Sequence, residues 1–210
     1  MPPLTPSPSG QFSSYILAGG QSRRFGSDKA LARLQGEPLI LRVARALAQV
    51  GPAPLVIADQ AEKYQHLGLV TLLDHVPQQG PLAGLQRALE HGANQGCARV
   101  LVAACDLLEL PAHWLRRLLA TPATSSAAFF HGRWDPFPGL YATRLLPEVT
   151  ERIHSQQLAL QPLLSAHAVA LPRPPDWPAV AQANTRDQLA DYASRIRDVP
   201  HASGNAETET

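Results

Sequence analysis

The 210-residue sequence lacks the features that mark secreted, membrane-spanning or metal-cluster proteins. Its two cysteines, Cys97 and Cys105, form no Cys-x-x-Cys pair, so they indicate neither a disulfide framework nor a zinc site. No apolar run approaches the roughly 18–20 residues that cross a bilayer. The first residues have neither the basic start nor the apolar stretch of a secretory signal. We therefore expect a cytoplasmic protein with buried free thiols.

The sequence also lacks a surplus of charge of either sign. Its 18 Lys and Arg residues balance 17 Asp and Glu residues, which leaves a net charge of +1. The eight histidines are scattered, with no pair at metal-ligand spacing along one helix face. This balance favours neither nucleic acid nor an anionic membrane as the main partner, and we expect no partner of either kind.

Short apolar segments alternate along the chain with segments of helical periodicity. The strand candidates are mostly without polar alternation, as in strands that are covered on both faces. They are Ser14–Ala18, Leu55–Ala58, Leu69–Leu73, Arg99–Ala104 and Ala127–Phe130. Helical spacing is found in Pro38–Val50, Pro81–His91, Pro111–Ala120, Thr143–His154 and Thr185–Arg195. The alternation predicts a three-layer α/β/α sandwich with a mainly parallel, Rossmann-like sheet.

The two ends of the chain differ in composition from the segment between them. Residues 1–12 are rich in Pro and Ser, and residues 196–210 are polar, so we expect two disordered tails. Residues 13–195 would then form a single domain. Near its end, Thr185 and Gln188 fit a capping box, in which the two side chains satisfy reciprocal backbone donors at a helix start.

A glycine-rich and basic segment follows the first strand candidate. Gly19 and Gly20 lack a Cβ, so the backbone can turn sharply and present consecutive N–H groups to an anion. Arg24 adds a planar fork of donors and Lys29 a compact positive charge. The spacing fits neither a Walker A loop nor a Gly-x-Gly-x-x-Gly fingerprint. Leu17–Lys29 thus predicts a nucleoside triphosphate site, although an ordinary basic strand-to-helix connection would share part of the pattern.

Two aspartates stand where strand candidates end, at the edge where parallel sheets bind ligands. Asp106 follows an apolar run and could hold Mg²⁺, which prefers oxygen ligands and substrate phosphates. Such an ion would neutralise charge on the α-phosphate and the departing pyrophosphate. Locally, a helix cap or turn before Pro111 is the alternative. Asp74 could contact the base or the ribose, or could be a plain turn aspartate.

Several motifs, in order, resemble those of the molybdenum cofactor guanylyltransferases within the nucleotidyltransferase superfamily. The resemblance covers about residues 14–192. The opening motif is Leu17-Ala18-Gly19-Gly20-x-Ser22-x-Arg24-Phe25-Gly26-x-Asp28-Lys29-Ala30. It is followed by Asp74, Gly80-Pro81-Leu82-Ala83-Gly84-Leu85, Cys105-Asp106 and Asn184-Thr185-x-x-x-Leu189.

The resemblance implies the nucleotide-diphospho-sugar transferase type of fold and a defined reaction. GMP would pass from GTP to molybdenum-molybdopterin, giving the guanine dinucleotide cofactor and pyrophosphate. Molybdoenzyme apoproteins or their chaperones would be further partners. Catalysis would fall to Arg24, Lys29 and Asp106, with Mg²⁺ on Asp106. The nucleotide would contact Leu17, Ala18, Gly19, Gly20, Lys29, Asp74 and Asp106.

Departures from the family pattern leave alternatives open. Ala58 stands where many relatives have an Asn, Leu107–Glu109 replaces a Pro-containing segment, and Asp135 replaces a His on the acceptor-side strand. The alternatives are a related transferase that uses CTP or a sugar- or alcohol-phosphate acceptor, or a non-catalytic nucleotide-binding or cofactor-chaperone protein. Asn184 would contact the metal or pyrophosphate by its family position, and a helix N-cap role explains it equally well.

Overall fold

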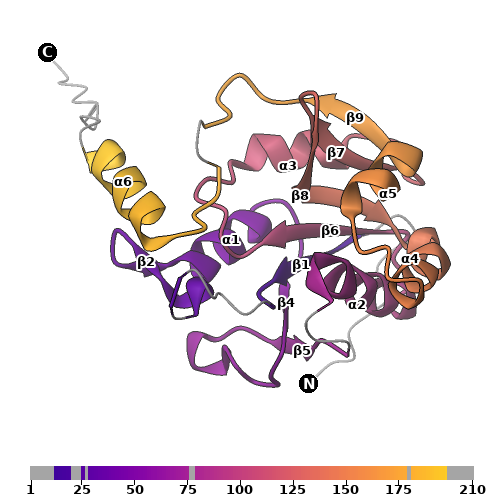
Figure 1. Ribbon diagram of the computed structural model, residues 1–210, viewed down its shortest axis with the longest axis horizontal. Coiled ribbons are helices and arrows are strands. Elements are labelled where there is room, and N and C mark those ends of the chain that lie inside the picture. Colours follow the sequence, from indigo (N-terminus) through magenta and orange to yellow (C-terminus); the bar gives the residue numbers. More distant parts are fainter. Residues whose placement is uncertain (1–11, 20–24, 27, 76–78, 179–180, 198–210) are drawn as a thin grey trace, which may run out of the picture.

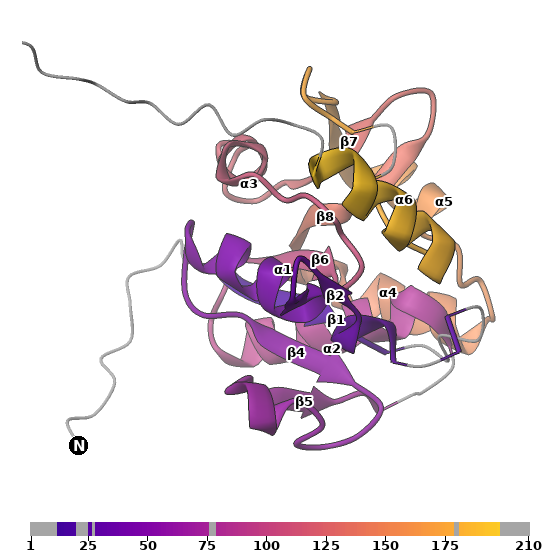
Figure 2. The same cartoon turned by 90° about the vertical axis from the view of Figure 1, so that its left-hand side faces the viewer.

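A seven-stranded sheet forms the centre of the computed structural model, which describes residues 12–19, 25–26, 28–75, 79–178 and 181–197. Its strand order is β5-β4-β1-β6-β8-β7-β9, and Figure 2 shows the strands rising in this order from β5 to β7. The strands are β1 (Phe12–Leu17), β4 (Leu55–Ala58), β5 (Thr71–Leu73), β6 (Arg99–Ala104), β7 (Ser126–Phe130), β8 (Trp134–Ala142) and β9 (Ala168–Pro172). Among the described residues of this sheet, the two pairings that involve β8 are antiparallel and the other four are parallel, so the predicted mainly parallel sheet is confirmed.

Helices cover both faces of this sheet, as the predicted three-layer sandwich requires (Figure 1). They are α1 (Leu39–Ala48), α2 (Gly80–Asn94), α3 (Ala112–Leu119), α4 (Leu146–His154), α5 (Leu160–His167) and α6 (Arg186–Arg197). Short 3-10 turns are η1 (Lys29–Leu31), η2 (Gln65–Leu67) and η3 (Thr143–Leu145), and β2 (Arg33–Leu34) pairs with β3 (Glu37–Pro38). The side chains of α1 and α3 join one core cluster, and those of α2, α4 and α5 join the other. None of the described helices combines the length and apolar character that a bilayer crossing requires.

Alternate residues of the central strands enter opposite core layers. In β1, Ile16 joins the cluster of α1 and α3, while Tyr15 and Leu17 join the cluster of α2, α4 and α5. Leu101 and Val102 of β6 divide in the same way. Since both faces are buried, these strands need apolar residues at nearly every position. This is why they read as continuous apolar runs in the sequence.

The main difference from the predicted elements lies in β8, where only the family resemblance indicated a strand. Pro136 and Pro138 interrupt this segment, and proline cannot donate to a strand ladder. The pairing with β7 accommodates them by a bulge, because the register passes from Gly139 directly to Asp135. Strand β9 and helix α5 were not expected at all.

The first strand and the last helix extend slightly beyond the residues expected for the domain. Strand β1 begins at Phe12, whose ring packs on the core, and α6 continues to Arg197, with Ile196 packed against a third cluster. Apolar contacts therefore carry the regular elements just beyond 13–195. The remainder of the two expected tails lies outside the described residues.

Gly92 generates a test of the packing between α2 and the sheet. A Cβ at this position would lie 2.4 Å from Cγ1 of Val100, so Gly92→Ala forces the helix and β6 apart. We expect its free energy of unfolding in urea to fall by about 1–3 kcal/mol, the usual effect of overpacking. The exposed Asn94 at the end of the same helix supplies the control, since Asn94→Ala should change stability by no more than about 0.5 kcal/mol. Equal stability of the two variants would contradict this packing.

Candidate functional site

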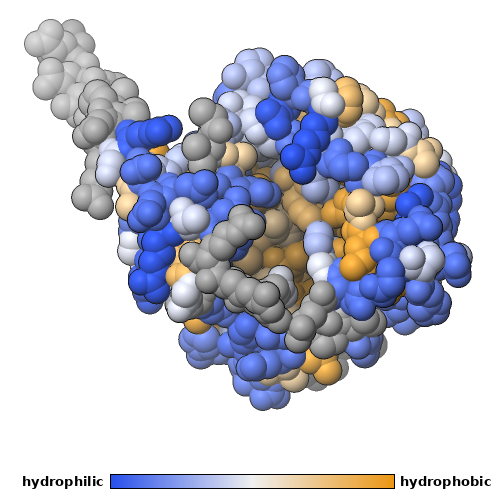
Figure 3. All heavy atoms as spheres, viewed as in Figure 1, coloured by the Kyte–Doolittle hydropathy of each residue, from blue (hydrophilic) through white to orange (hydrophobic). Residues whose placement is uncertain are grey.

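A cavity of about 280 Å³ opens at the carboxyl ends of β1, β4, β5 and β6, the edge at which the sequence predicted a ligand site. In Figure 3 it is a hollow with an apolar floor. The strand ends are aligned by two backbone hydrogen bonds, from Ala18 N to Ile57 O (2.9 Å) and from Cys105 N to Leu17 O (3.1 Å). The lining comprises Leu17, Ala18, Gly19, Asp28, Lys29, Ile57, Asp74, Gly80, Pro81, Gly84, Ala104, Cys105, Asp106 and Phe137.

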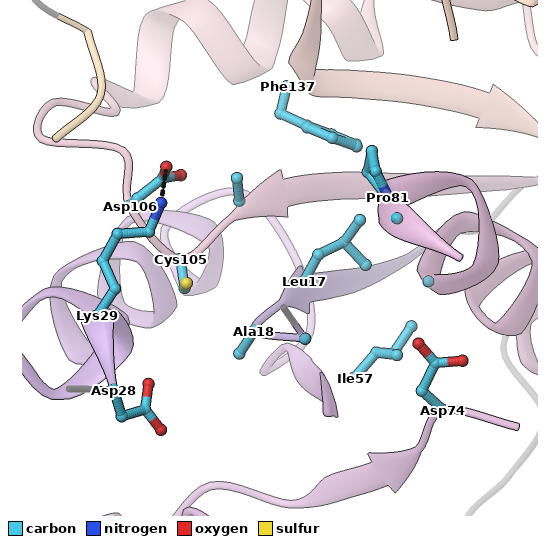
Figure 4. A pocket seen from close by; sticks show the side chains of 14 residues that line it. Leu17, Ala18, Asp28, Lys29, Ile57, Asp74, Pro81, Cys105, Asp106 and Phe137 are labelled. Carbon is cyan, nitrogen blue, oxygen red and sulfur yellow. Dashed lines mark hydrogen bonds and ion pairs between the residues drawn. The ribbon is translucent and has the colours of Figure 1, made fainter. Parts of the chain in front are cut away.

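Lys29 and Asp106 form an ion pair at one side of this cavity (Figure 4). Nζ of Lys29 lies 2.5 Å from Oδ2 of Asp106, and the two side chains are only 19% and 9% exposed. Lys29 begins η1, and Asp106 follows β6, which is hydrogen-bonded to β1. Pairing of adjacent parallel strands therefore brings together two predicted site residues that are 77 positions apart.

The turn that carries Lys29 is anchored through Asp28. Oδ1 of Asp28 accepts a hydrogen bond from Ala30 N at 3.0 Å, which caps the turn. Oδ2 accepts from Tyr64 Oη at 3.0 Å and lies 3.2 Å from Lys63 Nζ. Tyr64 is fully buried, and burial raises the pKa of its hydroxyl, which therefore remains a donor. Asp28 lies within the opening motif, but nothing in the sequence pattern indicated Tyr64 or Lys63 as its partners.

Cys105 lies beside Asp106 without the properties of a nucleophile. Its thiol is buried, and burial raises its pKa to about 12, so it stays protonated at neutral pH. Cys97 is also a free thiol but only half-buried. The expectation of two free thiols is confirmed, whereas full burial holds for Cys105 alone.

Asp74 occupies the side of the cavity opposite the ion pair (Figure 4). A Cβ added to Gly19 would lie 3.7 Å from Oδ2 of Asp74, so the carboxylate sits over the backbone of the glycine segment. A Cβ on Gly84 would lie 3.0 Å from Leu17, which shows how closely α2 packs against β1. The segment of Gly19 and the segment of Gly80 and Gly84 therefore both contribute backbone to the cavity wall. Leu17 and Ile57 lie between the two charged sides.

The remaining predicted residues have mixed outcomes. Gly20 and Arg24 lie outside the described residues. Asn184 is exposed, and its N–H donates to Oε1 of Gln188 at 2.8 Å. The predicted capping box forms with this one-residue shift, since the hydroxyl of Thr185 accepts from Gln188 N at 3.2 Å.

The positions that depart from the family pattern also have defined environments. Arg173 donates two hydrogen bonds to the carboxylate of Asp135, from Nε to Oδ2 at 2.6 Å and from Nη2 to Oδ1 at 2.7 Å. Asp135 is not among the residues that line the cavity. Ala58 is buried. Phe137, two residues beyond Asp135, was not predicted as a site residue, yet it lines the cavity wall opposite Leu17. Its place on the acceptor-side strand was the one signal that could have found it.

In the part of the chain that the structure describes, no three His, Cys, Asp or Glu side chains come together to hold a metal ion. Mg²⁺ commonly binds one or two carboxylates and completes its shell with substrate phosphates and water. Asp106 at the cavity wall suits such an ion, brought in with a phosphorylated ligand, better than a metal held by the protein alone.

The chain is similar in sequence to a known domain family and to named proteins. Residues 14–194 match the MobA-like NTP transferase domain. A protein of Nostoc sp. named "Probable molybdenum cofactor guanylyltransferase" is 33% identical over 194 residues, which covers 89% of this chain and 92% of the relative. The molybdenum cofactor guanylyltransferase of Rhodobacter capsulatus is 32% identical over 189 residues, which covers 89% and 97% of the two chains.

Solved structures show the same fold at lower identity. Molybdopterin-guanine dinucleotide biosynthesis protein A from Archaeoglobus fulgidus aligns with a TM-score of 0.72 and 20% identity over 89% of this chain and 98% of that one. CMP:2-keto-3-deoxy-manno-octonic acid synthetase, complexed with CTP, aligns with a TM-score of 0.65 and 15% identity over the same shares. These likenesses confirm the predicted type of fold. The domain match and the relatives above 30% identity lead to one conclusion: the chain belongs to the molybdenum cofactor guanylyltransferase family of nucleotidyltransferases.

Proposed function

We propose that the chain transfers GMP from GTP to molybdenum-molybdopterin, forming the guanine dinucleotide cofactor and releasing pyrophosphate. The observation that carries the proposal is the division of one cavity into two charged sides, with the Lys29–Asp106 pair on one and Asp74 on the other. A nucleotide has the same division, with a triphosphate at one end and hydrogen-bonding base edges at the other. The names of the relatives support guanine and molybdopterin as the two substrates.

On the phosphate side, binding would exchange partners within the existing ion pair. Lys29 is held by Asp106. An arriving triphosphate offers the ammonium group of Lys29 a higher density of negative charge. The carboxylate of Asp106 would then hold Mg²⁺ together with the phosphates. The ion, when bound, neutralises charge that develops on the departing pyrophosphate. Backbone amides of the glycine segment and Arg24 would add further donors to the same phosphates.

On the base side, Asp74 would recognise guanine. The N1–H and 2-amino groups of guanine are adjacent donors, and a carboxylate has two oxygens that accept from such a pair. Cytosine has no equivalent pair of donors on one edge. The apolar side chains of Leu17 and Ile57 lie between Asp74 and the ion pair, where the nucleotide would pass.

The reaction itself is an in-line displacement at the α-phosphorus. An oxygen of the molybdopterin phosphate attacks the α-phosphorus. The bond from the α-phosphorus to the oxygen that bridges it to the β-phosphorus breaks. Pyrophosphate leaves with the electron pair of that bond. The attacking phosphate is already ionised, so no general base is needed, and the protonated Cys105 forms no intermediate. Catalysis then depends on orientation and on charge stabilisation by Lys29, with Asp106 holding the metal ion that would share this role.

The decisive assay is pyrophosphate release by the purified protein with Mg²⁺ and molybdenum-loaded molybdopterin, with GTP and CTP compared. We expect release with GTP and only background release with CTP or without the acceptor. Preference for CTP would contradict the proposed substrate. Tight GTP binding without release would instead support a cofactor chaperone.

Removal of either member of the ion pair tests the phosphate side. We expect Lys29→Ala and Asp106→Asn each to lower kcat/KM by about 10²-fold or more, the scale seen when a charge-stabilising group is lost. Arg45→Ala and Asp176→Asn are matched controls, because Arg45 and Asp176 belong to partly exposed ion pairs and lie outside the cavity lining. Loss of a partly exposed ion pair is worth about 1 kcal/mol at most, so the controls should lose less than about fivefold. Full turnover by either site variant would contradict these assignments.

Asp74→Asn tests the base side by an exchange of specificity. Xanthine carries an oxygen where guanine carries the 2-amino group, so an Asn amide can donate to it. We expect the variant to lose about tenfold or more of its kcat/KM for GTP and to gain activity with xanthosine triphosphate. Asp59→Asn, at the end of the neighbouring strand and outside the cavity lining, should leave the preference for GTP unchanged. An equal loss with both nucleotides would show that Asp74 contacts the ribose or another part common to both.

A further inference from the structure

The C-terminal helix α6 packs against both loops that carry the ion pair. In Figure 1 it lies outside the three layers, on the side of α1 and β2. A third apolar cluster, separate from the two faces of the sheet, joins it to these loops. Leu189 and Tyr192 of α6 contribute to this cluster, as do Phe25 from the glycine segment and Leu108 from the loop after β6. The helix thus contacts both loops without lining the cavity.

Arg186 connects α6 to the loop that carries Lys29. Its Nε donates to the backbone carbonyl of Phe25 at 3.0 Å, across 161 positions of sequence. The Phe25 ring is buried in the third cluster, so this residue is fixed by both its backbone and its side chain. Phe25 lies three positions before Asp28, which caps the turn of Lys29. A shift of Phe25 would therefore move the base of the turn that places the Lys29 ammonium group.

Tyr192 connects the same helix to the loop that carries Asp106. Its hydroxyl donates to Oε1 of Glu109, three positions after Asp106. Burial raises the pKa of Tyr192, so the hydroxyl remains a donor throughout the physiological range.

The segment before α6 also holds this loop through backbone contacts. Ala183 N donates to Asp106 O at 3.2 Å, and Leu108 N donates to Ala181 O at 3.0 Å. Leu107 and Gln182 form a β-bridge between these bonds. The loop that presents the Asp106 carboxylate is therefore paired along its backbone and fixed by a side chain from α6.

We propose that Arg186 and Tyr192 are positioning residues for nucleotidyl transfer. Arg186 positions the loop that carries Phe25 and Lys29. Tyr192 positions the loop that carries Asp106 and would hold the metal ion. The inference rests on the proposed function for the identity of the ligands. It goes beyond that function because neither residue lines the cavity or belongs to the predicted site. A single helix would then fix the position of the Lys29 loop relative to the Asp106 loop.

The two roles predict separable defects, which binding measurements can distinguish. GTP affinity would be measured by calorimetry without divalent metal, and Mn²⁺ affinity of the GTP-loaded protein by electron paramagnetic resonance. We expect Arg186→Gln to weaken GTP binding about threefold to tenfold, on the scale of one hydrogen bond, with Mn²⁺ affinity near that of the wild type. Tyr192→Phe should show the reverse pattern. Arg186→Lys should recover part of the GTP affinity, because an ammonium group can also donate to the Phe25 carbonyl.

Two matched variants serve as controls. Arg195→Gln removes an exposed arginine from the same helix. Tyr15→Phe removes a buried hydroxyl whose partner is Nδ1 of His91, at 2.8 Å. His91 is in the last turn of α2, whereas the first residues of that helix line the cavity. Both controls should keep wild-type affinities for GTP and Mn²⁺, whatever their melting temperatures.

The inference is overturned if Arg186→Gln and Tyr192→Phe change only the melting temperature, or if both weaken GTP and Mn²⁺ binding to the same degree. Either result would assign α6 a purely structural role. Failure of the proposed function is a different observation, because it concerns the wild type: no GTP binding, or no pyrophosphate release with molybdenum-molybdopterin. A wild type that binds GTP without turnover still permits the binding test of Arg186 and Tyr192.

Discussion

The contact of 2.5 Å between Lys29 and Asp106 links the two loops on which the site depends. Each side chain is largely withdrawn from water, and a charge in such a position is stable only with a partner. Without ligand the two groups satisfy each other. In the proposed reaction, a triphosphate and its cation would provide one replacement for each, so the pair would open without leaving an isolated buried charge. The sheet makes this possible because β1 and β6 are direct neighbours and end at the same edge.

Much of the surrounding structure maintains the geometry of this pair. Asp28 caps the turn of Lys29 and is itself held by Tyr64 and Lys63. On the opposite loop, the backbone of Asp106 is bonded to the segment before α6. These supports come from regions of the chain that are distant in sequence. In the proposed reaction, Lys29 and Asp106 would exchange partners without moving the backbone, because their backbone positions are fixed independently of the ion pair.

The sequence predicted those parts of the molecule that have a local signal. β4 and β6 have the predicted limits, because strands that are buried on both faces are nearly continuous apolar runs. The predicted site residues Leu17, Ala18, Gly19, Lys29, Asp74 and Asp106 all line one cavity, since the carboxyl ends of parallel strands meet at one edge. The features that were not predicted depend on long-range contacts. The bulge that accommodates the prolines of β8, the Tyr64–Asp28 bond and the Arg186–Phe25 bond leave no periodicity or spacing in the sequence.

The exchange of partners at the ion pair can be observed in a crystal structure of the protein with a non-hydrolysable GTP analogue and Mg²⁺. We expect Lys29 Nζ to contact the phosphates, Asp106 the metal ion and Asp74 the guanine edge. An intact Lys29–Asp106 contact with the metal bound elsewhere would contradict it, as would a nucleotide bound in the opposite direction.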